Sequence, residues 1–221
     1  MKRFSRRRLS LAVMDLAQHE RHALAALLRD VGPDAPTCCE GWNTRDLLIH
    51  LLVRERHPLA AAGMFFTPAQ GLLEARSREY EREPFATLVD SWAARESQWL
   101  PMRLADRMVN AAEHFVHHED VRRAMPQWEP RQYSAEMEDS LAVIAERMLP
   151  LLLRKSTRPV VVVPDGRKRI LCADRRGVTK RGSDVVHVFG AVGELLLLGF
   201  DRPVVGVTFD GDKSHIVAST V

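Results

Sequence analysis

The spacing of apolar residues changes once along the chain of 221 residues, and this change constrains the fold more than any other feature. Up to about residue 153, apolar side chains recur at helical spacing, in segments that end at proline or glycine. After RKSTRP (154–159), short runs rich in valine and isoleucine take over, which is typical of β-strands. The sequence therefore predicts an α+β protein with an up-and-down helical bundle (1–153) and a small α+β domain (159–221).

Five longer helices are expected before this change. They cover residues 9–31, 43–57, 84–100, 106–124 and 134–153, with a loop and a short helix over 59–83. Asn43 can cap the second of these helices, because Asp46 three residues later completes a capping box. The second domain is expected to contain two strands around an Asp165-Gly166 turn (159–177), a strand at 184–189, a helix at 190–200 and a strand at 203–209.

Charge and cysteine content exclude some classes of protein. The net charge is +3, but the first ten residues carry five basic side chains and no acid, so the remainder is +3 − 5 = −2. The folded part is therefore not basic, which argues against nucleic acid as the main ligand, because binding to phosphates needs a basic face on the fold itself. The longest apolar runs, ELLLLGF (194–200) and LPLLL (149–153), are too short to span a membrane. Two of the three cysteines are adjacent, so we expect no disulfide framework and a reducing cytoplasm.

Two of the expected helices carry side chains that bind metals. His50 lies in the aliphatic run DLLIHLLVRE (46–55), and Glu113 and His117 are four residues apart in NAAEHFVHHEDVRRA (110–124). Residues at i and i+4 lie on one face of a helix, so this carboxylate and imidazole can reach a single point. With His50 from a neighbouring antiparallel helix they form a set of two histidines and one carboxylate. Such a set binds a divalent metal and leaves coordination positions open.

The spacing alone leaves alternatives open. His114 and His118 form a competing pair on a different face of the same helix, which we expect to lie nearer the rim. His50 can also be an ordinary core histidine that is hydrogen-bonded to a carbonyl group. Cys39, in the loop before the second helix, has two interpretations: a residue that this loop brings near the site, or, as we favour, a small packed residue.

The blocks APTCCEGWNTRDLLIHLLVRERHP (35–58) and EHFVHHED (113–120) resemble motifs of the DinB-like superfamily. They are most similar to the branch of mycothiol-dependent maleylpyruvate isomerase, in which a Gly-Trp pair precedes an Asp-Leu-x-x-His helix. GAVGELLLLGFDRP (190–203) resembles the sterol-carrier-like carboxy-terminal domain of that branch. The resemblance covers nearly the whole chain. It departs from the family pattern at the extra histidines His114 and His118 and at RERHP (54–58).

This resemblance implies that His50, Glu113 and His117 bind the metal, with zinc the usual occupant. It places Asp120 one turn beyond the ligands, where it accepts the far N–H of a liganding imidazole or holds a nearby arginine. The alternative is that Asp120 is an ordinary charge on the helix surface. It also implies that an arginine of the second domain assists catalysis, and Arg202 is our candidate. Other arginines compete for this role: Arg167, Arg169, Arg175, Arg176 and Arg181.

The leading functional hypothesis is a metal- and thiol-dependent enzyme. It would be an isomerase or S-transferase that uses mycothiol as cosubstrate and acts on small electrophiles in a cleft between the domains. An alternative is a metal-binding protein without turnover, such as a stress or regulatory module. A third reading is that the second domain binds an apolar molecule. No nucleic acid and no membrane are expected as partners.

Overall fold

The computed structural model describes residues 6–64, 66–94, 103–174, 177 and 184–218. The chain forms two compact units. The bundle unit comprises residues 17–129, and the sheet unit comprises residues 1–16 and 130–221. Helix α1 (Arg6–Val31) contributes residues to both units.

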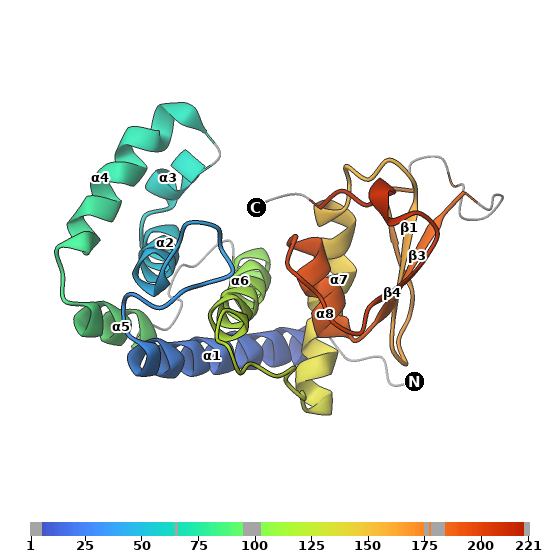
Figure 1. Ribbon diagram of the computed structural model, residues 1–221, viewed down its shortest axis with the longest axis horizontal. Coiled ribbons are helices and arrows are strands. Elements are labelled where there is room, and N and C mark those ends of the chain that lie inside the picture. Colours follow the sequence, from blue (N-terminus) through green and yellow to red (C-terminus); the bar gives the residue numbers. More distant parts are fainter. Residues whose placement is uncertain (1–5, 65, 95–102, 175–176, 178–183, 219–221) are drawn as a thin grey trace. The chain divides into compact units, whose positions relative to one another are not determined.

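Helices make up the bundle unit (Figure 1). After α1 they are α2 (Thr44–Arg56), α3 (Pro58–Ala61), the 3-10 turns η1 (Ala62–Met64) and η2 (Thr67–Ala69), α4 (Gln70–Glu81), α5 (Phe85–Ala93) and α6 (Arg103–Arg123). The core combines the apolar faces of α1, α2 and α5, including Leu24, Leu28, Leu48, Leu88 and Trp92. The expected helices at 9–31, 43–57 and 106–124 are therefore present within a few residues of their predicted bounds.

The start of α2 follows the predicted capping chemistry. The Asn43 side chain accepts a hydrogen bond from the Asp46 N–H, and the Asp46 carboxylate accepts one from the Asn43 N–H. These two bonds satisfy backbone donors that a helix leaves free at its first turn. The cap fixes where α2 begins and so which of its residues face α6.

Among its described residues, the sheet unit contains the start of α1, two further helices and four short strands (Figure 1). Its elements are α7 (Ala135–Leu152), β1 (Val160–Pro164), β2 (Ile170–Cys172), β3 (Val186–Gly190), α8 (Val192–Gly199), β4 (Thr208–Asp210) and the 3-10 turn η4 (Lys213–His215). The strand order is β2-β1-β3-β4, with β1 and β3 parallel and the other pairs antiparallel. The predicted α+β class, with strands around the Asp165-Gly166 turn, is confirmed.

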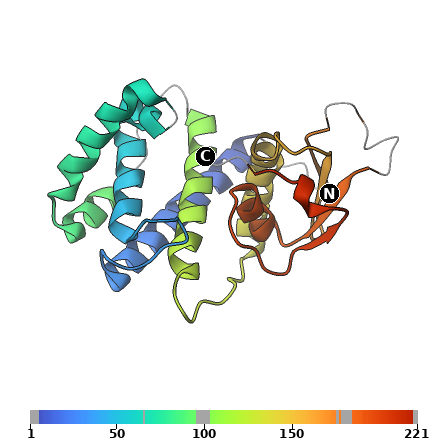
Figure 2. The ribbon, with the colours of Figure 1, turned by 45° about the horizontal axis from the view of Figure 1, so that its top comes forward.

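The compact units divide the chain at a different place from the predicted boundary at residues 153–159. Helix α7 packs on α8 of the sheet unit, and both views show the two helices side by side (Figures 1 and 2). Gly199 permits this close approach, since a Cβ atom there would lie 2.5 Å from Leu149 Cδ2. The apolar periodicity of residues 134–153 located the helix correctly but could not reveal which neighbour covers it.

Two further details differ from expectation. Residues 59–83 are mostly helical, because α4 extends over twelve residues where a loop with a short helix was predicted. Helix α5 is described from Phe85 to Ala93, and the remainder of the predicted 84–100 helix lies outside the described residues. None of the helices that the structure describes combines the length and the apolarity needed to span a bilayer.

Candidate metal centre

The structure brings His50, Glu113 and His117 together between α2 and α6. One carboxylate oxygen, Glu113 Oε2, lies 3.6 Å from His50 Nε2 and 3.4 Å from His117 Nε2. The three donor atoms all lie within 4.8 Å of one another. The helical spacing of Glu113 and His117 therefore has the predicted consequence, and His50 meets them from α2.

Arg54 is a member of this cluster that the sequence reasoning missed. Its Nε lies 3.4 Å from Glu113 Oε2, and its Nη1 donates a 2.8 Å hydrogen bond to Asn110 Oδ1. Moving from His50 to Arg54 along α2 thus corresponds to moving from His117 back to Asn110 along α6, so the helices are antiparallel. Because Arg54 is four residues after His50, the i, i+4 rule could have identified it.

His50 is the least satisfied polar group of the cluster. Its Nε2 is buried without a hydrogen-bond partner among the described residues, since 3.6 Å from Glu113 is too long for a hydrogen bond. Burial lowers the pKa of His50 below its usual value, and this outweighs the opposing effect of Glu113. A neutral imidazole presents a lone pair, which is the form that binds metals.

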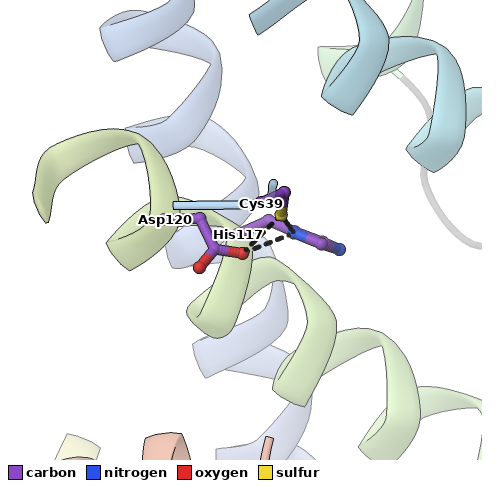
Figure 3. Close-up of side chains that lie close together, drawn as sticks. All are labelled: Cys39, His117 and Asp120. Carbon is purple, nitrogen blue, oxygen red and sulfur yellow. Dashed lines mark hydrogen bonds and ion pairs between the residues drawn. The ribbon is translucent and has the colours of Figure 1, made fainter. Parts of the chain in front are cut away.

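The opposite nitrogen of His117 is held by Asp120. The distance from His117 Nδ1 to Asp120 Oδ2 is 3.0 Å, and the carboxylate is almost fully buried (Figure 3). Burial alone would lower the pKa of His117, but hydrogen bonds with Asp120, Cys39 and Glu113 raise it well above its usual value. A proton held on Nδ1 leaves Nε2 as the atom that points toward Glu113 and His50.

Glu113 is ionised in this surrounding. Burial alone would raise its pKa, but His117, His50 and the nearby charge of Arg54 hold the pKa well below its usual value. The site therefore offers one negative oxygen and two imidazole nitrogens. The Arg54 guanidinium faces this oxygen, and its hydrogen bond to Asn110 holds it there.

The geometry of these donors fits a small divalent cation. Ligands about 2.1 Å from a tetrahedral zinc ion lie about 3.4 Å from one another. The separations of 3.4 and 3.6 Å around Glu113 Oε2 are close to this value. Other buried histidines lie closer to their carboxylates. His114 is 2.9 Å from Glu55, His117 is 3.0 Å from Asp120, and His118 is 2.7 Å from Glu20.

We expected the competing pair His114 and His118 to lie nearer the rim, and this expectation is wrong. Both side chains are buried, because α1 covers this face of α6. His114 contacts the Ala17 carbonyl and Glu55 at 3.0 and 2.9 Å, and His118 contacts Glu20 at 2.7 Å. These histidines therefore belong to buried hydrogen-bonded contacts between helices, separate from the His50 cluster.

Cys39 lies beside the cluster, which agrees with the less favoured of its two interpretations from the sequence. Its thiol donates a 3.2 Å hydrogen bond to Asp120 Oδ2, and its sulfur lies 4.0 Å from His117 Nδ1 (Figure 3). Cys39, His117 and Asp120 thus form a second group of possible metal ligands. Cys39 and His117 both lie at ordinary hydrogen-bond distances from Asp120, so we interpret Cys39 and Asp120 as residues that hold His117 in position.

A pocket of about 360 Å³ adjoins the cluster within the bundle unit. His50 and Trp42 lie in its wall, and their ring centroids are 5.1 Å apart. The other lining residues come from the loop before α2 and from α2, η1 and α4: Gly41, Asp46, Ile49, Met64, Leu73, Ser77 and Glu81. The volume is within the range of small-molecule sites.

Arg202 lies in the sheet unit just after α8, and its Nη1 donates a 2.9 Å hydrogen bond to the Phe200 carbonyl. Of the competing arginines, Arg167 pairs with Asp139 and Glu138 of α7. Arg175, Arg176 and Arg181 lie outside the described residues. The role of Arg202 stays a prediction.

Two solved structures share the fold. One is mycothiol-dependent maleylpyruvate isomerase, with a TM-score of 0.61, 14% sequence identity and 95% of each chain covered. The other is a single-residue mutant of the same enzyme, with a TM-score of 0.59, 17% identity and the same coverage. Neither a protein-family model nor a curated protein matches the sequence. At these identities the likeness establishes the fold, and the chemistry must be argued from this chain's own residues.

Proposed function

We propose that this protein binds a divalent metal ion through His50, Glu113 and His117, with zinc as the expected occupant. The observation that carries the proposal is the buried Nε2 of His50, which has no hydrogen-bond partner and lies beside a carboxylate and a second imidazole. Buried polar atoms in proteins nearly always have partners. A cation bound by the three donors would supply the missing partner.

We propose further that the protein is a mycothiol-dependent isomerase or S-transferase that acts on small electrophilic substrates. A divalent ion held by two imidazoles and one carboxylate keeps open positions and lowers the pKa of a thiol that binds it. The shared fold with a mycothiol-dependent isomerase supports mycothiol as the thiol. The pocket beside His50 supplies a place for the substrate.

The protein's own residues have distinct tasks in this proposal. Asp120 holds the proton on His117 Nδ1, so that Nε2 of the same ring stays oriented toward Glu113. Arg54 holds the Glu113 carboxylate in position. Arg202 is proposed to hold an anionic group of the substrate. The pocket wall near Trp42 keeps part of the substrate out of water.

Metal analysis of the purified protein and its variants tests the first half of the proposal. We expect about one equivalent of zinc in the wild-type protein and a strong loss in His50→Ala, Glu113→Ala and His117→Ala. The His118→Ala variant is the control and should keep its metal, because His118 pairs with Glu20 away from the cluster. Equal loss in the His118 variant would contradict the assignment of the ligands.

A thiol-dependence assay tests the second half. The zinc-loaded protein is mixed with a panel of electrophiles, with and without mycothiol, and consumption of each electrophile is followed. The proposal requires that at least one electrophile is consumed faster with both protein and mycothiol present. If none is, while zinc binds as expected, the chain is the metal-binding module without turnover.

A further inference from the structure

The loop before α2 reaches the last turns of α6 and binds Asp120 there in two ways. The Cys38 N–H donates a 2.9 Å hydrogen bond to the Asp120 carbonyl, and the Cys39 thiol donates to Asp120 Oδ2. Asp120 Oδ2 is also the oxygen that contacts His117 Nδ1. A single carboxylate oxygen thus connects a cysteine thiol to a proposed metal ligand (Figure 3).

The position of Cys39 is fixed by the hydrogen bonds of its own loop. Its N–H donates to Thr37 Oγ1 at 3.1 Å, and its carbonyl accepts from the Trp42 N–H at 3.1 Å. The thiol therefore approaches Asp120 from a constrained backbone. Asp120 and His117 are almost fully buried, whereas Cys39 is partly exposed. Cys39 is therefore the least buried member of this chain of contacts, and its thiol is the group to probe with a small reagent.

We propose that Cys39 is a positioning residue of the metal centre, and that modification of its thiol weakens metal binding. The inference rests on the proposed function, because it requires that His117 is a metal ligand. A group attached to Sγ removes the S–H donor and adds bulk against Asp120 Oδ2. Asp120 then loses the position in which it orients His117, and Nε2 turns away from Glu113. Electrophiles that escape the active site would in this way switch off metal binding.

Iodoacetamide is a suitable probe, because its reaction with the thiol is defined. The thiolate forms an S–C bond with the methylene carbon, iodide leaves, and the thiol proton passes to the buffer. Cys172 is not expected to react in the folded protein, since it is buried and burial raises its pKa to about 12. Of the three cysteines, only Cys38 and Cys39 are partly exposed.

The experiment alkylates each of these two cysteines alone. Metal-free Cys38→Ala protein takes up one label at Cys39, and metal-free Cys39→Ser protein takes up one label at Cys38, which mass spectrometry verifies. Zinc affinity is then measured by competition with a chromophoric chelator. We expect alkylation at Cys39 to weaken zinc binding at least about tenfold. Alkylation at Cys38 is the matched control and should change affinity less than about twofold, because Cys38 contacts Asp120 through its backbone.

Two unlabelled variants separate positioning from packing. Cys39→Val is about one methyl group larger than cysteine and has no donor, and we expect about threefold to tenfold weaker zinc binding, less than for a residue that contacts a ligand directly. Cys39→Ser keeps a donor and should restore wild-type affinity. The visible spectrum of the cobalt-substituted protein should change in Cys39→Val and return in Cys39→Ser. A merely structural role would change the unfolding midpoint without this pattern.

The outcomes distinguish this inference from the proposed function. If wild-type protein binds zinc and the Cys39-alkylated protein binds it equally well, the positioning role is wrong and the metal centre stands. If the folded wild-type protein binds no zinc, the proposed function fails, and the inference fails with it.

Discussion

Replacing His50 by leucine in the metal-free protein separates a metal ligand from an ordinary core histidine. The Nε2 atom is buried without a partner, which costs about 1–3 kcal/mol of folding free energy. Burial lowers the pKa of His50, so the side chain is neutral at pH 7 and the substitution removes no charge. Leucine is of similar size, and repacking costs less than about 1.5 kcal/mol. We therefore expect the free energy of unfolding to stay level or to rise by up to about 3 kcal/mol.

The assay is urea unfolding of chelator-treated protein, combined with a zinc titration of the same samples. His114→Leu is the control, because His114 is fully buried and has both ring nitrogens bonded, to the Ala17 carbonyl and to Glu55, whereas the buried Nε2 of His50 has no partner. Removing those bonds should cost about 3–5 kcal/mol. Zinc binding should show the reverse order, with a strong loss in His50→Leu and little change in His114→Leu.

The reasoning would be refuted if His50→Leu destabilised the metal-free protein as much as His114→Leu does. His50 would then make a structural contribution that its unpartnered nitrogen does not suggest. A His50→Leu protein that bound zinc with wild-type affinity would refute it independently, since the ligand assignment requires that nitrogen.

Four more outcomes follow from the same contacts. Glu113→Gln should weaken zinc binding more than about tenfold by calorimetry, since it removes the shared oxygen. Zinc binding at pH 7 should release about one proton, measured with an indicator in weak buffer, because the raised pKa of His117 keeps a proton that the metal displaces. Glu55 has a pKa lowered from 4.5 to about 2, so it stabilises the fold above pH 4.5, and about 3 kcal/mol is lost as the pH falls to 2. Unfolding curves of Glu55→Gln should lack this loss, and curves parallel to wild type would contradict it. Gly199→Ala should lower the free energy of unfolding by about 1–3 kcal/mol in denaturant titrations, because its Cβ would lie 2.5 Å from Leu149 Cδ2.

Local sequence signals predicted the parts of the site that lie within one helix or at its start. The capping box of Asn43 and Asp46 fixed the beginning of α2, and helical spacing placed Glu113 and His117 on one face of α6. The contact of Asp120 with His117 also follows from spacing, since the two are three residues apart. These features depend on residues that are close in the chain, and the sequence contains that information directly.

Features that depend on distant parts of the chain were not predicted. His114 and His118 were expected at the rim because nothing near them in sequence indicates that Glu55 and Glu20 would reach them from other helices. Cys39 was interpreted as a packed residue because its partner Asp120 is 81 residues away. The assignment of α7 to the sheet unit has the same cause, since apolar periodicity locates a buried face without naming its partner.

The separations around Glu113 give the clearest argument for a cation. Where buried histidines elsewhere in the described chain meet carboxylates, the contacts are 2.7–3.0 Å, which are ordinary hydrogen bonds. Around Glu113 Oε2, however, the nitrogens of His50, His117 and Arg54 lie 3.4–3.6 Å away. Well-packed interiors close such gaps unless the surrounding backbone holds the groups apart. A backbone that holds two imidazole nitrogens 3.4 and 3.6 Å from one carboxylate oxygen therefore supports the proposed ion between them.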